Sequence, residues 1–187
     1  MNLILFGPPG AGKGTQAKYL VEKLGNFQVS TGEILRNEIQ NNSEIGKKIA
    51  DDMNDGRFVS DQIVNNLIEE ILNDPKKKNK LIFDGYPRSL IQAKNLEKLL
   101  VRTNQTIDFI FFLNVDKNII VKRIENRRIL EKRSDDDLNT FIKRYDTYMA
   151  TTKPVLDFYS KNPNFYEIDG SSEISEITTK IDNFINV

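Results

Sequence analysis

The stretch "GPPGAGKGTQ", residues 7 to 16, follows a short apolar run, "LILF". It is one letter away from the pattern G-x-x-x-x-G-K-[ST], in which backbone N–H groups of a glycine-rich loop hold phosphate oxygens. Gly7, Gly12 and Lys13 occupy their places in that pattern. A helix starting near Lys13 would direct its positive amino-terminal end at the same phosphates. We therefore interpret the stretch as a phosphate-binding loop rather than an ordinary glycine-rich turn.

The loop departs from the pattern at Gly14, where a serine or threonine normally supplies a hydroxyl to Mg²⁺. Thr15 brings a hydroxyl one residue late. The best replacement is Asp84, a single carboxylate at the end of the predicted strand "LIFD", in the position of a Walker B acid. Because Mg²⁺ keeps several waters, Asp84 could hold it through them without direct ligation. The alternative is that Asp84 is a turn residue before Gly85.

The composition of this chain of 187 residues limits its chemistry. Lysine plus arginine equals aspartate plus glutamate, at 27 each, so no net charge favours nucleic acid or an anionic membrane. The absence of cysteine and histidine excludes disulfides, a Cys/His zinc site and nucleophilic mechanisms that need a histidine base. No stretch has the length of a membrane span, and the first residues already form a predicted strand. We expect a soluble, cytoplasmic protein that binds neither nucleic acid nor membrane.

Short β-rich runs alternate with amphipathic helical stretches along the chain. The predicted strands are Asn2–Phe6, Phe27–Ser30, Lys80–Asp84, Ile107–Asn114 and Asn164–Asp169. Continuous apolar runs such as "LIF" and "FIFFL" are typical of strands covered on both faces, as in a parallel sheet. Because helices separate the strands, the sequence predicts a single α/β domain with a doubly wound, parallel, five-stranded sheet and helices on both faces.

Helix limits follow from capping residues. "STGE" has the form of a capping box, with Ser30 as N-cap and a glutamate three residues later. Ser60 precedes "DQIVNNLIEEIL", whose apolar side chains recur at helical spacing. A helix capped by the aspartate at 116 is predicted to run to residue 124, and a longer helix is predicted from residue 137 to about residue 159.

Two segments do not fit this alternation. Residues 31 to about 59 contain two short helical pieces and the break "NDGRFVS", with no strand between them. Residues 126–136, "NRRILEKRSDD", form a dense charged patch between two predicted helices. Both are predicted to be insertions that project from the carboxyl edge of the sheet, where ligands of such folds bind.

Several arginines are candidates for phosphate binding: Arg36, Arg88, Arg123, Arg127, Arg128, Arg133 and Arg144. Because a transferring phosphoryl group spreads negative charge over its oxygens, its catalysis is mostly positioning plus cationic stabilisation, and a guanidinium can grip it with two parallel hydrogen bonds. Any one arginine could instead be a solvated surface side chain, and for Arg128 that interpretation is at least as good. Arg88 is favoured, because "DGYPR" places it just after a strand end and Pro87 fixes the backbone before it.

Four motifs, "GPPGAGKGTQ", "STGEILR", "DGYPRSLIQA" and "RSDD…KRYDTY", together closely resemble those of the adenylate kinases, within the nucleoside monophosphate kinases. They follow the family's order and spacing over the whole chain, and the GKGT form of the loop is the family's own variant. The resemblance implies a P-loop NTPase core with two small mobile insertions: a nucleoside-monophosphate-binding region at about 30–59 and a short lid at about 126–136. It also implies Mg²⁺ bound with ATP and oriented by waters on Asp84, no zinc, and a monomer.

The resemblance also implies roles for single residues. Those implied to bind ATP are Gly10, Ala11, Gly12, Lys13, Gly14, Thr15, Arg123 and Arg127, with the backbone of Gly170–Ser172, Ser172 included, near the adenine. Those implied to bind AMP are Thr31, Arg36, Arg57, Phe58, Val59, Gly85, Tyr86, Pro87, Arg88 and Gln92. Arg133 and Arg144 would bridge the phosphates of both nucleotides, with Asp135 and Asp136 orienting the lid arginines. The implied catalytic residues are Lys13, Asp84, Arg88, Arg123, Arg133 and Arg144.

Two residues predict which nucleoside monophosphate accepts the phosphoryl group. UMP/CMP kinases share the short lid, and "RSDD" and "TTKP" resemble theirs equally well. Thr31 and Gln92, however, stand where those enzymes tend to have alanine and asparagine. A side chain that hydrogen-bonds a base edge can discriminate strongly, because the wrong base leaves polar groups unpaired. The resemblance thus implies reversible transfer from Mg·ATP to AMP, giving two ADP; the alternatives are a UMP/CMP kinase and a P-loop nucleotide-binding module without transferase activity.

Overall fold

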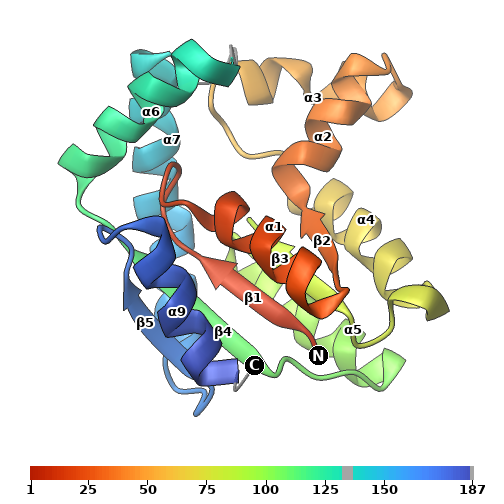
Figure 1. Ribbon diagram of the computed structural model, residues 1–187. Helices are drawn as coiled ribbons and strands as arrows, with labels where there is room; N and C mark the ends of the chain where they lie inside the picture. The colour runs from red at the N-terminus through yellow and green to blue at the C-terminus, as the bar shows by residue number, and fades with distance from the viewer. Residues whose placement is uncertain (132–136, 186–187) are drawn as a thin grey trace.

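The computed structural model describes residues 1–131 and 137–185, apart from the side chains of residues 130 and 131. Its centre is one parallel sheet with the strand order β2-β3-β1-β4-β5 (Figure 1). The strands are β1 (Leu3–Phe6), β2 (Phe27–Ser30), β3 (Leu81–Asp84), β4 (Phe109–Asn114) and β5 (Phe165–Asp169). The expected five-stranded parallel sheet is confirmed, and the predicted strands differ from the observed ones by at most two residues at their starts.

Helices connect the strands. They are α1 (Lys13–Leu24), α2 (Thr31–Gln40), α3 (Glu44–Asn54), α4 (Asp61–Asn73), the short η1 (Pro75–Lys77), α5 (Leu90–Thr103), α6 (Lys117–Glu131), α7 (Leu138–Thr147), the π-helical η3 (Tyr148–Thr152), α8 (Lys153–Tyr159) and α9 (Ile174–Ile185). In Figure 1, α1 and α9 lie in front of the sheet and α4 and α5 behind it, while α2 with α3 and α6 with α7 form two arms above.

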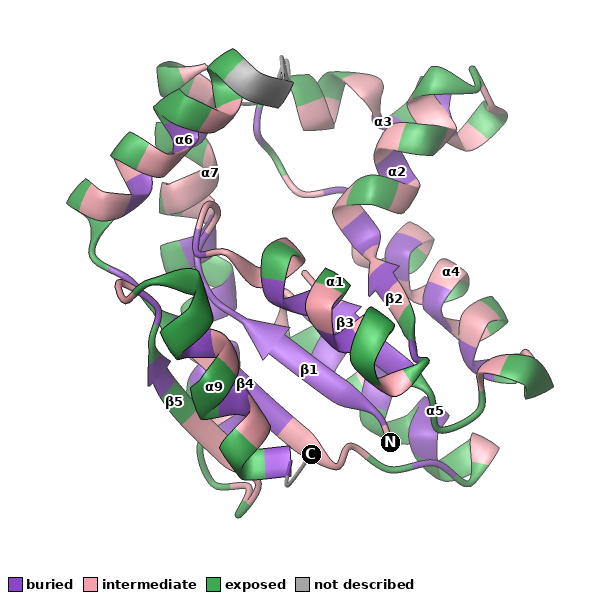
Figure 2. Ribbon diagram, in the orientation of Figure 1, coloured by how far each residue is buried: buried purple, intermediate pink, exposed green. Residues whose placement is uncertain are grey.

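The core consists of two layers, because successive strand residues point to opposite faces of the sheet. On one face Ile4 and Phe83 pack with α4, α5 and α8. On the other face Leu5 and Ile82 pack with α1, α6 and α9. The strand β1 is therefore buried on both sides, as its colour shows in Figure 2. This two-sided burial explains the uninterrupted apolar runs in the sequence.

Local signals predicted helix ends less well than strands. Ser30 and Ser60 do occupy N-cap positions, but neither side chain accepts a capping hydrogen bond, so the capping box predicted at Ser30 was wrong. Ser30 still belongs to β2, and the strand sets its side-chain direction. Asp137 does cap α7, accepting hydrogen bonds from two backbone N–H groups. The helix α6 continues to Glu131 rather than ending at residue 124, because the charged segment that follows is rich in good helix formers.

Candidate active site

The phosphate-binding loop lies between β1 and α1 at the carboxyl edge of the sheet. Three of its glycines have φ values that side chains rarely adopt: +152° at Gly7, +84° at Gly10 and +93° at Gly12. Gly10 also has no room for a side chain, since a Cβ there would lie 2.9 Å from Cγ2 of Ile120 on α6. The loop can thus turn its N–H groups inward while its outer side packs closely on α6.

Lys13 is the cation of this loop. Its Nζ donates hydrogen bonds to the carbonyl oxygens of Gly7, at 2.8 Å, and Pro8, at 3.0 Å. Burial lowers the pKa of Lys13 to about 8; Asp84 opposes this shift, and the positive charges of Arg88, Arg144 and Arg127 add to it. These groups come from three separate parts of the chain, and the fold brings all of them close enough to Lys13 to change its pKa.

Asp84 lies beside the loop, as the predicted metal position requires. The Cβ that a side chain at Gly14 would have lies 3.7 Å from Oδ2 of Asp84, and this is its nearest contact. Gln28 on β2 donates a hydrogen bond of 3.0 Å to the same oxygen. Among the described residues, no three acidic side chains gather as a direct metal cage would require. The donor set, one carboxylate beside a phosphate loop, suits Mg²⁺ held mostly by phosphates and waters.

A pocket lies between the two arms. Five parts of the fold contribute to it: α2, α3, the segment between α3 and α4, the loop after β3, and α7. Its lining residues are Gly32, Leu35, Arg36, Met53, Gly56, Arg57, Phe58, Val59, Arg88 and Arg144. Six of the residues predicted to bind AMP line this pocket, although they are scattered over more than a hundred positions of the sequence.

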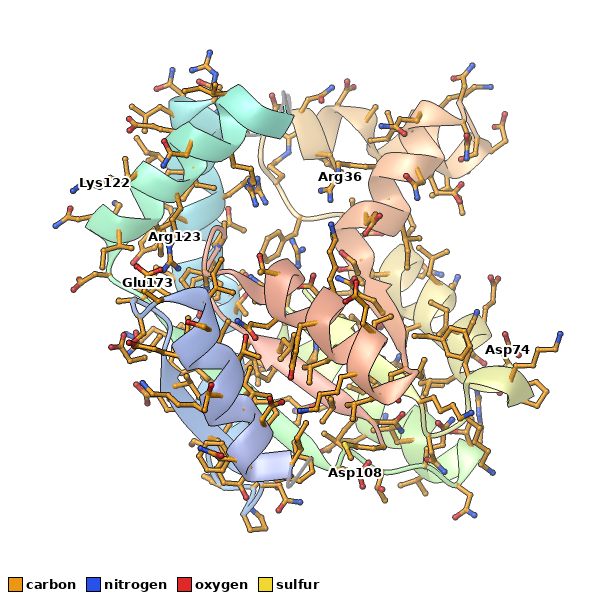
Figure 3. The ribbon with its side chains drawn as sticks, in the orientation of Figure 1. Arg36, Asp74, Asp108, Lys122, Arg123 and Glu173 are labelled. Atoms are coloured by element: carbon orange, nitrogen blue, oxygen red, sulfur yellow. The ribbon has the colours of Figure 1, made fainter. Side chains whose placement is uncertain are left out.

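The arginines of this pocket differ in their surroundings. Figure 3 shows Arg36 extending from α2 on the side that faces α6 and α7. The guanidinium of Arg88 lies 4.9 Å from the ring centre of Phe58, a cation–π contact. Arg57 pairs with Asp52, at 3.0 Å, and Asp55, at 2.7 Å, and its side chain is half exposed. The pocket therefore presents an arginine stacked on an aromatic ring, while the guanidinium of Arg57 is occupied by acidic neighbours.

Arg88 belongs to a tightly bonded loop. Its Nε donates to the carbonyl oxygen of Gly85, at 2.7 Å, and its backbone N–H donates to Oε1 of Gln92, also at 2.7 Å. Gly85 has φ +78°, and a Cβ there would approach Nη2 of Arg88 to 2.8 Å. The peptide bond between Tyr86 and Pro87 is cis. The glycine that follows the strand is thus required by both the turn and the arginine.

The two residues predicted to select the base are buried and bonded within the protein. Thr31 donates to the carbonyl oxygen of Gly85 at 2.7 Å. Gln92 accepts from the Arg88 N–H and donates from Nε2 to Oδ1 of Asp61 at 2.8 Å. These bonds use two of the four that a glutamine amide can make. Neither Thr31 nor Gln92 is among the residues that line the pocket.

Tyr86 packs in the core next to this loop. Its hydroxyl donates to Oδ1 of Asn65 at 2.9 Å and lies 3.2 Å from the carbonyl oxygen of Gln92. Burial raises its pKa to about 12, so the hydroxyl stays protonated at neutral pH. Tyr86 is thus a core residue under the pocket, and only its backbone could contact a ligand there.

Three more of the predicted site residues lie on α6, on α7 and after β5. Arg123 on α6 (Figure 3) lies with Nη1 3.5 Å from the carbonyl oxygen of Ala11, next to the phosphate loop. Arg144 on α7 packs close to Gly56, whose Cβ would lie 3.1 Å from its Cγ. Ser172 follows β5, and its hydroxyl lies 3.4 Å from Oδ2 of Asp169. Arg133, Asp135 and Asp136 lie outside the described residues.

Sequence reasoning missed two polar residues that support the site. Asp61, the first residue of α4, accepts from both Ser89 and Gln92. Thr152, in η3, donates to the backbone carbonyl of Arg88 at 3.0 Å. No local signal marks either one, because each acts on a partner that lies at least 28 positions away.

A second hollow, of about 370 Å³, lies far from these residues. It is lined by Met1, Asn79, Asn104, Gln105, Thr106 and Asp108 at the amino edge of the sheet. Figure 3 shows Asp108 at the end of the molecule opposite to Arg36. Gln105 and Asp108 are already bonded to the surrounding backbone, so this hollow offers no comparable set of binding groups. Within the described ranges, no helix combines the length and the apolar character that a membrane crossing needs.

Known adenylate kinases match this chain over nearly its whole length. A family model described as adenylate kinase matches residues 5–164. The adenylate kinase of Pelagibacter ubique (strain HTCC1062) is 48% identical over 213 aligned residues, with 100% of both chains covered. That of Caulobacter sp. (strain K31) is 42% identical over 187 residues, covering 100% of this chain and 99% of the relative. That of Mycoplasma capricolum subsp. capricolum (strain California kid / ATCC 27343 / NCTC 10154) is 41% identical, with 94% of both chains covered.

Proposed function

Because the chain belongs to the adenylate kinase family, we infer that it catalyses the reversible transfer of a phosphoryl group from ATP to AMP, giving two molecules of ADP. One observation supports this most directly. The positive charges of Arg88 and Arg144, from two distant parts of the chain, lie close enough to Lys13 of the phosphate loop to lower its pKa. Two nucleotides with their phosphates pointing at each other need such a cluster of cations, because their charges repel.

We propose that the phosphate loop holds the donor and the arginine-lined pocket holds the acceptor. Backbone N–H groups of the loop and the ammonium of Lys13 would bind the ATP phosphates, with Arg123 and Arg127 on the lid side and the backbone near Ser172 at the base. Arg36, Arg88 and Arg144 would bind the AMP phosphate, and Val59 and Phe58 would pack on its nucleoside. Arg133 is proposed to bridge the two nucleotides from the lid.

The proposed reaction needs no protein base. The attacking atom is a phosphate oxygen of AMP that is already ionised at neutral pH, which agrees with a chain that contains no histidine. The residues must instead align the two nucleotides and exclude water, since water would turn the transfer into hydrolysis. We propose that regions 30–59 and 126–136 close over the nucleotides for this purpose and that their opening limits turnover.

Mg²⁺ is expected to bind with ATP. Asp84 would hold it through waters, and Gly14 leaves the space beside this carboxylate open. When bound, the metal neutralises part of the charge that develops on the phosphates. Gln28 would keep the Asp84 carboxylate oriented through its hydrogen bond. The absence of zinc, the monomeric state and the cytoplasmic location stay predictions of the family resemblance.

AMP is proposed as the acceptor because the family resemblance assigns Thr31 and Gln92 to its base. The test is a panel in which the protein, ATP and Mg²⁺ are mixed with AMP, UMP, CMP or GMP and the diphosphates are separated by chromatography. We expect AMP to be phosphorylated at least about a hundredfold faster than the others. Faster phosphorylation of UMP or CMP would make the protein a pyrimidine kinase. ATP hydrolysis with no acceptor phosphorylated would reduce it to a nucleotide-binding module.

A further inference from the structure

We propose that Thr152 is a positioning residue for the reaction: its hydroxyl fixes the backbone of Arg88 and so aims the guanidinium at the acceptor phosphate. The inference rests on the proposed function. Thr152 is 4% exposed, and its Oγ1 donates a hydrogen bond of 3.0 Å to the carbonyl oxygen of Arg88. The two residues are 64 positions apart, so this bond links the helical segment after α7 to the loop after β3.

The local backbone explains why the side chain of Thr152 points to Arg88 rather than along its own helix. Tyr148–Thr152 form a π-helical turn, in which the N–H of Lys153 bonds to the carbonyl of Tyr148, five residues back. Such a turn inserts one residue into a helix and changes the direction of the side chains on it; π-turns frequently occur at functional sites. Pro154 follows in the first turn of α8, and it has no N–H to continue the earlier pattern.

Neighbouring threonines show that the bond of Thr152 is unusual. The hydroxyls of Thr147 and Thr151 bond to the carbonyl groups four residues before them, at 2.8 and 2.7 Å, as threonines in helices commonly do. Thr151 is exposed. Thr152, one position later, directs its hydroxyl away from its own helix to Arg88. The chain therefore contains two adjacent threonines of which only one contacts the site.

The bond completes a clamp on the backbone of Arg88. The N–H of Arg88 is held by Gln92 and its carbonyl oxygen by Thr152, so both peptide groups that flank its Cα are fixed. Only the side-chain torsions then remain to direct the guanidinium, and the bond from Nε to Gly85 restricts these as well. Because phosphoryl transfer depends on placing charge accurately, a small shift of this backbone would lower the rate.

The same turn connects Arg88 to Arg144. The N–H of Tyr148, where the π-turn begins, bonds to the carbonyl oxygen of Arg144, in the last turn of α7. The segment that carries Arg144 thus continues directly into the residue that holds Arg88. Two of the arginines proposed to bind the acceptor phosphate are therefore placed relative to each other through Thr152.

The test compares substitutions at the two adjacent threonines in the full chain. Thr152→Val removes the hydroxyl and keeps the shape, Thr152→Ser restores the hydroxyl, and Thr151→Val is the matched control. Steady-state kinetics of ADP formation are measured with AMP varied at saturating ATP. We expect Thr152→Val to lower kcat/KM for AMP by about tenfold, and Thr152→Ser and Thr151→Val to stay within about twofold of the original chain.

A double substitution distinguishes positioning from general packing. If Thr152 acts through Arg88, then Thr152→Val adds little, less than about twofold, to the loss caused by Arg88→Ala. Full additivity of the two losses, or an unchanged kcat/KM in Thr152→Val, overturns the proposal. Thr152→Ala, which leaves room for a water, replaces Thr152→Val in the cycle if the valine variant does not fold. Failure of the unaltered chain to make ADP from ATP and AMP would instead contradict the proposed function.

Discussion

The two halves of the proposed site are built in different ways. On the donor side, the centre of the proposed site is one short stretch, to which α6 and the loop after β5 add further groups. Lys13 bonds to carbonyl groups only five and six residues before it, and the loop offers its own backbone. On the acceptor side, the pocket is assembled from side chains of α2, α3, α7 and two loops, and one of its arginines, Arg88, is held by a threonine 64 positions away. A local motif thus prepares the donor site, whereas tertiary packing prepares the acceptor site.

This contrast predicts the largest effect for Lys13, because no other described side chain of the phosphate loop carries a positive charge. Lys13→Met keeps most of the length and removes the ammonium. We expect kcat/KM for ATP to fall by roughly a thousandfold or more, measured by coupled ADP formation, with an unchanged far-UV circular dichroism spectrum. Activity within tenfold of the original would mean that the loop backbone alone suffices, and the proposed role of Lys13 would be wrong.

On the acceptor side, the shape of the cation should matter as much as its charge. Arg88→Lys retains the charge and loses the planar fork, the bond from Nε to Gly85 and the stacking on Phe58. We expect a loss of roughly a hundredfold in kcat/KM for AMP, and a much smaller change in the affinity for ATP measured alone by calorimetry. An equal loss on both nucleotides would contradict the separation of the two halves.

Asp84 is proposed to hold Mg²⁺, so a substitution there should change how the rate depends on Mg²⁺ rather than the affinity for either nucleotide. Asp84→Asn keeps an oxygen for the hydrogen bond from Gln28 and removes the charge. We expect the rate at limiting Mg²⁺ to fall by about tenfold to a hundredfold and part of it to return at high Mg²⁺. A Mg²⁺ titration at fixed ATP and AMP measures this. A Mg²⁺ dependence identical to that of the original chain would favour the alternative in which Asp84 is only a turn residue.

The same contrast explains what the sequence could predict. The strands and the phosphate loop followed from local patterns, because burial on both faces and glycine at left-handed positions leave marks within a few residues. The acceptor pocket was predicted through family resemblance, and its supports Asp61 and Thr152 were not found. Each of these donates to or accepts from a group brought near by the fold, so no spacing within one element could indicate it. The long helix from 137 was predicted, but the π-turn that directs Thr152 was not.

A pair of glycines separates two effects of a side chain: strain in the left-handed backbone and a clash with Arg88 of the acceptor site. Gly85 and Gly25 both have left-handed φ values, +78° and +65°, but only Gly85 has neighbours within reach of a Cβ. Gly25→Ala should cost about 1 kcal/mol of stability and leave the kinetics unchanged. Gly85→Ala should cost a similar amount and in addition lower kcat/KM for AMP by about tenfold, because the methyl group displaces Arg88. Thermal unfolding and AMP kinetics of both variants decide this; equal kinetics would show that Arg88 adjusts freely.

The smallest expected effect concerns pH and the donor side alone. Since the pKa of Lys13 is lowered to about 8, the ammonium is charged below that pH and becomes neutral above it in the protein without nucleotide. The capture of ATP should therefore weaken as pH rises, with kcat/KM for ATP about twofold lower at pH 8 and about fourfold lower at pH 8.5 than at pH 7. Bound phosphates stabilise the ammonium and raise its pKa, so kcat at saturating ATP should decline only at higher pH.

Lys13→Arg, which stays charged throughout, should abolish the decline in kcat/KM. If the decline persists in this variant, another group titrates in this pH range. The lowered pKa of Lys13, to which Arg88 and Arg144 contribute, would then have no effect on the capture of ATP.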